Sequence, residues 1–349
     1  MNRRIQLLDC TLRDGGLGLE DAYKNQIADV GFTNQNTHEI AKNLKDADID
    51  IVELGSIEIS EEDKTRFAIY PNVEAVSEQI PVKKNAQQMF VGLFRGPDTP
   101  VEDIPEWKPS FVDGLRVIIR YSELQKSLDF CAELARKGYK VFVQPMLTMR
   151  YTPDEIEHMI DAANDMQAYA LYFVDSYGYM DNEDVLRLFR AYNAGLSKDI
   201  RIGFHAHNNM NLAYSNVKAF LSELSSERQV IVDACVTGMG QGAGNLQTEL
   251  IVPYLNQEYD SGYSYDSVLD VAEILDAFQM QNIWGYSVTR LLPAIHKTAY
   301  KYAIAFRKRY GLTYSEINRI LSSMPIELRH RYTIENAEAV LKMERIETK

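Results

Sequence analysis

The stretch RIGFHAHNN, residues 201–209, determines the fold that we expect, because a short apolar strand ends in two histidines and a polar turn. Side chains alternate along a strand, so His205 and His207 point the same way. Helical spacing of apolar residues follows over about 211–226. A strand, a polar turn and a helix in this order predict one β/α unit.

Similar units can be found from the N-terminus to about residue 260. The expected strands are Ile5–Leu8, Asp50–Leu54, Met89–Phe94, Leu115–Ile119, Lys140–Met146, Tyr172–Asp175, Arg201–Ala206 and Val230–Thr237, and the expected helices cover about 37–47, 72–80, 122–137, 153–167, 182–195, 211–226 and 246–258. The crossover at about 97–110 is rich in proline and poorly patterned. Eight strands alternating with helices predict an α/β fold, a parallel (β/α)8 TIM barrel with its active site at the carboxyl ends of the strands.

The chain length suggests a barrel with an appendage. Of the 349 residues, we assign 1–260 to the catalytic barrel and 261–349 to a helical C-terminal extension. With 46% hydrophobic residues, the chain can build a full core. Its 37 lysines and arginines against 50 acidic residues, a net charge of −13, predict neither a nucleic-acid nor a membrane partner. Small-molecule chemistry is therefore favoured.

No apolar run approaches the roughly 20 residues that cross a bilayer, and no secretion signal is recognised, so a cytoplasmic protein is expected. Cys10, Cys131 and Cys235 are widely separated and lack metal-binding spacing. They are expected to be core residues.

Polar side chains interrupt the last residues of several apolar strands. They are Glu53, Gln144, Asp175, Ser176 and the two histidines. Because the carboxyl ends of barrel strands meet at one face, these residues predict a functional site there.

The segment LDCTLRDGG, residues 8–16, is a second unusual cluster. We expect the strand to break there into a charged turn whose glycines adopt positive φ. Asp14 could add a carboxylate to His205 and His207. Two imidazoles and one carboxylate, with other positions left to water or substrate, predict an open site for a divalent cation.

Four segments in order carry a family resemblance: CTLRDG at 10–15, VELG at 52–55, GFHAHNN at 203–209 and GMGQGAGN at 238–245. The chain resembles the metal-dependent barrel lyases and synthases of the HMG-CoA lyase-like (DRE-TIM) superfamily, and within it most resembles the 4-hydroxy-2-oxovalerate aldolases. The extension is similar to the aldolases' communication domain. The resemblance therefore implies a 2-oxo acid substrate, a homodimer, and an aldehyde dehydrogenase as a partner bound through the extension.

Carried over by position, the resemblance implies that Asp14, His205 and His207 ligate a divalent cation, with Asn245 as a further ligand or next to the ligands. Manganese or magnesium fits such a mixed shell best, although zinc, cobalt or iron can also bind it. Asn245 ends the glycine loop 238–245.

The resemblance also implies that Arg13 pairs with Glu53 and stabilises the enolate formed from the substrate, since a guanidinium can hold developing negative charge. The residues expected to contact substrate are Gln144, Asp175, Ser176 and Gly240.

Two positions depart from the family pattern. The loop 238–245 lacks the cysteine of the lyases that cleave HMG-CoA, so that activity is not expected. Leu17 stands where the aldolases carry a catalytic histidine, and leucine cannot move a proton. Tyr302 is our first choice for the missing acid or base. Tyr300, the segment around Tyr23 and His38, and a water molecule in the site could also take this role.

The insert 18–36 is expected to lie over the mouth and indicates a changed substrate. One alternative function is a Claisen-type acyltransferase of the isopropylmalate or homocitrate synthase kind. The glycine loop of these synthases usually carries Glu-Arg where this chain has Gln241-Gly242. A second alternative is a non-catalytic barrel kept as a scaffold or regulatory subunit.

Simpler structural roles are also open for several residues. Arg13 and Glu53 could form a structural ion pair, and Asp175 could brace a helix or a ligand histidine. The histidines without companions, expected at the surface or in packing, are His158, His296 and His330.

Overall fold

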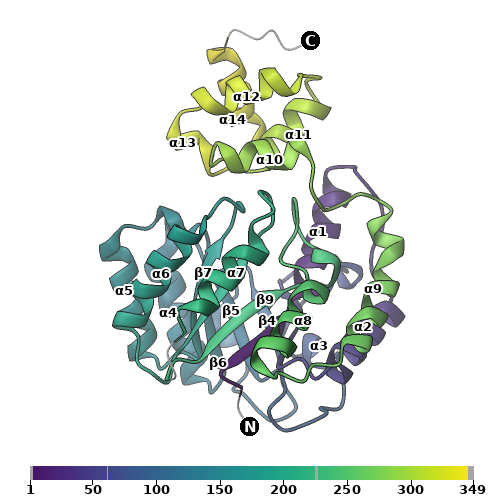
Figure 1. Ribbon diagram of the computed structural model, residues 1–349, viewed down its shortest axis with the longest axis vertical. Coiled ribbons are helices and arrows are strands. Elements are labelled where there is room, and N and C mark those ends of the chain that lie inside the picture. Colours follow the sequence, from purple (N-terminus) through teal and green to yellow (C-terminus); the bar gives the residue numbers. More distant parts are fainter. Residues whose placement is uncertain (1–2, 61, 225–226, 345–349) are drawn as a thin grey trace.

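The computed structural model describes residues 3–60, 62–224 and 227–344. Its centre is a closed barrel of eight parallel strands (Figure 1). These are β1 (Ile5–Asp9), β2 (Ile51–Ile57), β4 (Met89–Phe94), β5 (Gly114–Ile119), β6 (Lys140–Pro145), β7 (Ala170–Asp175), β8 (Arg201–Ala206) and β9 (Val230–Ala234). The barrel closes because β1 pairs with both β2 and β9, and the short β3 (Ile69–Tyr70) extends the sheet beside β2. The predicted TIM barrel is confirmed.

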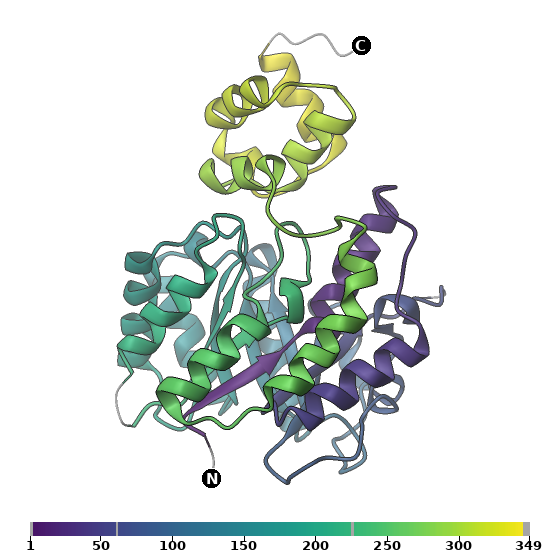
Figure 2. The same ribbon diagram turned by 45° about the vertical axis from the view of Figure 1, so that its right-hand side comes forward.

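An outer layer of helices surrounds the strands (Figures 1 and 2). It contains α1 (Thr11–Lys24), α2 (Asn34–Asp46), α3 (Val73–Ser77), α4 (Leu124–Arg136), α5 (Pro153–Asp165), α6 (Asn182–Gly195), α7 (Ala213–Ser222), α8 (Thr248–Tyr259) and α9 (Tyr265–Gln279). Between β4 and β5 only a short 3-10 turn, Val101–Asp103, forms, as the poor pattern there indicated. Among the described residues, no helix has the length and apolar character needed to cross a bilayer.

Local sequence explains where these elements begin. In α5, Pro153 occupies the first turn, and the preceding Thr152 forms a capping box with Glu155. All six residues of β7 are buried, as expected for a parallel strand covered on both faces.

The segment after β1 differs from its prediction. Residues 11–24 form α1 instead of a charged turn, and its glycines have no positive φ. They allow close packing: a Cβ on Gly16 would lie 2.0 Å from the carbonyl oxygen of Phe67, and one on Gly18 would lie 2.6 Å from that of Gly240. The expected loop 18–36 is thus partly a buried helix, because tertiary contact outweighs the low helix propensity of glycine.

Five helices form a separate unit, here called the cap. They are α10 (Val288–Ile295), α11 (Lys301–Lys308), α12 (Tyr314–Ser323), α13 (Ile326–Arg329) and α14 (Ile334–Met343). The cap has its own hydrophobic core, whereas α9 and Trp284 belong to the barrel's core. The boundary drawn at residue 260 is therefore too early, because α9 packs against α2 and α8.

The cap lies over one end of the barrel (Figures 1 and 2). Its contacts identify this end as the mouth. Asp21 of α1 accepts a hydrogen bond of 2.9 Å from the Tyr300 hydroxyl and pairs with Lys301 at 2.5 Å. The hydroxyl of Tyr177, just after β7, donates to the main-chain oxygen of His330 at 2.8 Å. Any ligand at the carboxyl ends of the strands therefore lies beneath the cap.

Candidate active site

Three predicted metal ligands meet at the mouth. Asp14 lies in the first turn of α1, His205 lies near the end of β8, and His207 directly follows this strand. Oδ2 of Asp14 is 3.7 Å from Nε2 of His205 and 3.9 Å from Nε2 of His207. One ligand atom from each residue lies within 4.8 Å of the others. This spacing suits one cation held between a carboxylate and two imidazoles.

Hydrogen bonds fix both histidine rings in a metal-binding orientation. Nδ1 of His205 lies 2.9 Å from Oδ2 of Asp233, and Nδ1 of His207 lies 2.9 Å from the main-chain oxygen of Asp175. These contacts hold the proton of each neutral imidazole on Nδ1, so that in the neutral form each Nε2 has a lone pair facing Asp14.

The charges of these groups follow from burial and neighbours. Burial opposes ionisation of Asp14, but Arg13 and the two histidines outweigh it and lower its pKa to about 2. Burial and the adjacent His205 lower the pKa of His207 to about 4. For His205, burial is outweighed by the hydrogen bond to Asp233, which raises its pKa to about 9. At neutral pH, Asp14 is therefore anionic and His207 is neutral, whereas His205 keeps a proton on both nitrogens until a cation displaces the proton from Nε2.

Asn245 supports the carboxylate of Asp14. Its Nδ2 lies 2.6 Å from Oδ2 of Asp14 and 3.1 Å from the carbonyl oxygen of Met239. Its Oδ1 is buried and has no partner. A Cβ on Gly240 would lie 2.3 Å from Nδ2 of Asn245, so Gly240 makes room for this contact and is not one of the residues that line the cavity.

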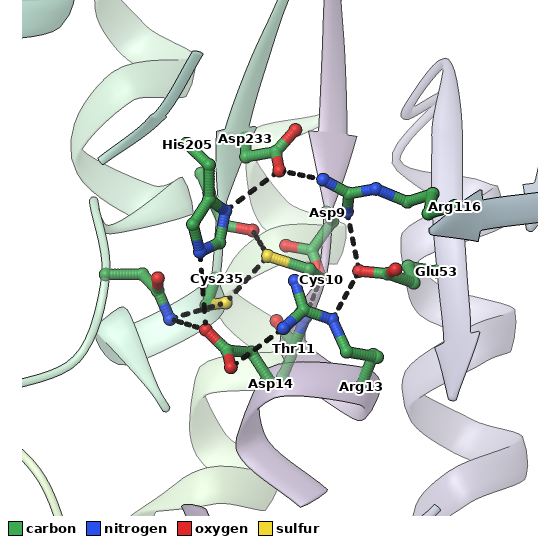
Figure 3. Close-up of polar contacts among 12 residues, drawn as sticks. Asp9, Cys10, Thr11, Arg13, Asp14, Glu53, Arg116, His205, Asp233 and Cys235 are labelled. Carbon is green, nitrogen blue, oxygen red and sulfur yellow. Dashed lines mark hydrogen bonds and ion pairs between the residues drawn. The ribbon is translucent and has the colours of Figure 1, made fainter. Parts of the chain in front are cut away.

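A buried chain of charges runs beneath the ligands (Figure 3). Arg13 donates through Nη1 to Asp14 at 2.9 Å and through Nε to Glu53 at 2.7 Å. Arg116 donates to Glu53 at 2.6 Å and also binds Asp233. Since Asp233 holds the ring of His205, the chain connects two of the predicted metal ligands, Asp14 and His205. Glu53 thus positions Arg13 and makes no contact with the cavity.

The sequence prediction missed Arg116 and Asp233. The signal was present, because each is a charged residue inside an otherwise apolar strand, β5 and β9 respectively. Cys10 and Cys235 are buried as expected, but their sulfur atoms also meet at 3.2 Å beside these charges.

A cavity of about 320 Å³ lies between these groups and the cap. Arg13, Asp14 and both histidines line it, and Leu17 occupies its wall. Gln144 and Ser176 also line it, as expected. Nε2 of Gln144 is buried without a partner, whereas Oγ of Ser176 accepts the amide hydrogen of Leu147 at 2.8 Å.

Asp175 does not line the cavity. Its carboxylate accepts the amide hydrogens of Tyr179 at 3.0 Å and Met180 at 3.1 Å, and burial raises its pKa to about 7. The predicted substrate contact is therefore wrong. Asp175 braces its own loop with its side chain and His207 with its main-chain oxygen.

The structure places Tyr302 and Tyr300 differently from the prediction. Tyr302 is fully buried in the cap, where its hydroxyl lies 2.6 Å from the carbonyl oxygen of Leu328, so its predicted catalytic position is wrong. Tyr300 instead lines the cavity, with its ring over Gly242. Tyr23 and His38 are exposed and do not line the cavity, so neither is placed to move a proton there.

Comparison with known proteins agrees with this geometry. Residues 116–280 match the HMGL-like family model. A "4-hydroxy-2-oxovalerate aldolase" of Carboxydothermus hydrogenoformans is 28% identical over 287 residues, which cover 80% of each chain. An "oxaloacetate decarboxylase" of Mycobacterium tuberculosis is 25% identical over 278 residues, covering 79% of this chain and 76% of the relative.

Among solved structures, the N-terminal domain of a putative aldolase from Bacteroides vulgatus superposes with a TM-score of 0.73 at 21% identity. The match covers 90% of this chain and 99% of that domain, which supports the fold. The predicted resemblance to the HMG-CoA lyase-like superfamily is confirmed.

Proposed function

We propose that this protein is a divalent-metal-dependent aldolase that cleaves a 4-hydroxy-2-oxo acid to pyruvate and an aldehyde, or runs this reaction in reverse. Several relatives are named for this reaction, at 25–28% identity. The observation that carries the proposal is that Asp14, His205 and His207 converge beside Arg13 on the cavity. A 2-oxo acid lying there would meet a cation site and a guanidinium together.

The donor set fits a divalent cation, because both Nε2 atoms and an ionised carboxylate face one point. Manganese or magnesium is the metal we propose for these nitrogen and oxygen ligands. When bound, the cation supplies a Lewis acid for the 2-oxo group. Arg13 has Nε and Nη1 committed to Glu53 and Asp14, and among the described residues nothing binds Nη2. Nη2 is therefore free to stabilise the enolate oxygen.

Tyr300 is the residue we assign to proton transfer in place of the family histidine. Its hydroxyl donates to Oδ2 of Asp21 at 2.9 Å, and Lys301 holds the other oxygen of that carboxylate. During cleavage, the 4-hydroxyl proton passes to the Tyr300 oxygen while Tyr300 gives its own proton to Asp21. The carbon–carbon bond then breaks, leaving the aldehyde and the enolate. The proton on Asp21 returns to Tyr300 as Tyr300 gives its own proton to the enolate carbon, which yields pyruvate and restores both residues.

Decarboxylation of oxaloacetate would pass through the same enolate, and one relative is named for that reaction. The acyltransferase alternative is less favoured, because Gln241 and Gly242 replace the Glu-Arg expected of those synthases. The scaffold alternative is less favoured because the ligand set is intact. The homodimer, the dehydrogenase partner and the cytoplasmic location stay predictions.

Deuterium exchange of the pyruvate methyl protons tests the proposal, because it needs the enolate but no aldehyde. The wild-type protein with manganese should exchange these protons, and a chelator should abolish the exchange. The double variant His205→Ala/His207→Ala should lose both metal and exchange.

His158→Ala is the matched control, since His158 is exposed and bonds Gln125 outside the cavity. Normal metal content in the double variant would refute the assigned ligands. Exchange of an acyl-CoA methyl group, but not of pyruvate, would favour the acyltransferase. Release of carbon dioxide from oxaloacetate, without any aldol cleavage, would favour the decarboxylase.

A further inference from the structure

The cavity wall carries three hydrogen-bonding groups that the protein leaves unused. Nε2 of Gln144 and Nδ1 of His330 are buried without partners. Within the described part of the chain, the guanidinium of Arg331 makes no hydrogen bond or ion pair. All three residues line the cavity, Gln144 from β6 and the other two from the cap. Because a buried polar group without a partner is costly, the groups on Gln144 and His330 indicate a ligand, and the exposed side chain of Arg331 is free to reach the same ligand.

Fixed positive charge surrounds the cap side of this wall. Burial lowers the pKa of His330, and the nearby Arg150 and Arg329 lower it further. The protein as a whole has a net charge of −13, so the local positive charge here is opposite in sign to the charge of the whole chain. The ring of His330 stacks parallel to that of Tyr177, with centroids 6.3 Å apart. His330 thus packs against Tyr177 and lines the cavity with its Nδ1 unpaired.

Much of the cavity wall is apolar. Its apolar side chains include Leu17, Leu93, Ile118, Met146, Leu147 and Val174. The groups assigned to the 2-oxo acid, Arg13 and the cation ligands, come from α1 and β8, whereas Arg331 comes from the cap. A cavity of about 320 Å³ falls in the range that holds complete small metabolites, so it has room beyond pyruvate.

We propose that the aldehyde portion of the substrate ends in a second anionic group, a carboxylate or a phosphate, which binds Arg331, His330 and Gln144. This assignment rests on the proposed aldolase function and specifies its substrate class. A guanidinium recognises either anion through charge-assisted hydrogen bonds, and the apolar wall covers the carbon atoms between the two ends. The aldehyde released by cleavage then carries the distal charge.

Aldol addition of pyruvate to three aldehydes tests the inference: succinic semialdehyde with a carboxylate, glyceraldehyde 3-phosphate with a phosphate, and butanal without charge. We expect kcat/KM for at least one anionic aldehyde to exceed that for butanal by about tenfold or more, as one charge-assisted hydrogen bond provides. The preferred anion identifies the source of the charge. Arg331→Gln should remove most of this ratio, and Arg331→Lys should keep part of it.

Arg319→Gln is the matched control, because Arg319 is an exposed arginine of the cap outside the cavity. It should keep the wild-type ratio, and using a ratio cancels any loss of folded protein. Equal use of butanal and both anionic aldehydes, or an unchanged ratio in Arg331→Gln, would overturn the inference while pyruvate exchange still supports the aldolase. Absence of pyruvate exchange in the wild type would overturn the proposed function and this inference with it.

Discussion

Replacing Arg116 with glutamine tests whether the buried charge chain holds the site together. The Arg116 side chain is fully buried and contacts both Glu53 and Asp233. Its loss leaves Glu53 with Arg13 alone, and Asp233 with His205 and the Tyr172 hydroxyl. Removing one partner of a buried ion pair costs about 3–5 kcal/mol, because the other charge stays in a poorly solvated place. We expect the free energy of unfolding to fall by that amount.

Urea unfolding with a chelator present measures this loss without a contribution from bound metal. Fluorescence of Trp107 and Trp284 reports the barrel, to which both belong. Arg120→Gln is the control, since Arg120 also binds two carboxylates, Asp98 and Glu123, but at the surface. Exposed pairs contribute little, so the control should lose much less. If both variants lose the same free energy, the reasoning about burial is refuted.

Three further changes have defined outcomes. Burial raises the pKa of Asp9 to about 6, so the stability that its protonated carboxyl contributes is complete below about pH 4 and is lost as the pH rises through 6. The free energy of unfolding, measured by urea titrations at pH 4 and 7, should therefore fall by up to about 3 kcal/mol, and Asp9→Asn should remove this fall. Gly16→Ala places a methyl group against the carbonyl of Phe67 and should lower the melting temperature, by a loss of about 1–3 kcal/mol; an unchanged value would contradict the close packing of α1. Tyr300→Phe should lower aldol turnover about a hundredfold with normal metal content, whereas Tyr302→Phe should lower the stability of the cap and leave turnover unchanged. The reverse result would show that Tyr302 carries out the proton transfer.

The barrel could be predicted because each strand is a short apolar run between turns. The strand expected at Arg201–Ala206 has those bounds in the structure. Helix α1 could not be predicted in this way, because its three glycines disfavour a helix in isolation. These glycines are needed because Phe67 and the glycine loop pack closely against α1. A local sequence pattern does not show such tertiary contacts.

The site was predictable where topology alone brings residues together. Asp14, His205 and His207 follow strands whose carboxyl ends must meet, so spacing was enough to find them. Tyr300 and Tyr302 required more, since two positions along a helix differ by about 200° around its axis. Tyr300 precedes α11 and faces the barrel, while Tyr302 faces the cap's own core. To choose between the two tyrosines, one must know how the cap packs on the barrel, and the periodicity of the sequence does not contain this information.

Because the cap has its own hydrophobic core, its sequence can evolve with little effect on the packing of the barrel. Arg13 and the predicted cation ligands rest on the barrel's core, whereas Tyr300, His330 and Arg331 belong to the five-helix unit above it. Substitutions in that unit can reshape the upper wall without disturbing the packing that holds Asp14 and the histidines. A lineage that keeps Tyr300 can therefore exchange one aldehyde for another by altering the rest of the cap, while inheriting the cation site and Arg13 intact.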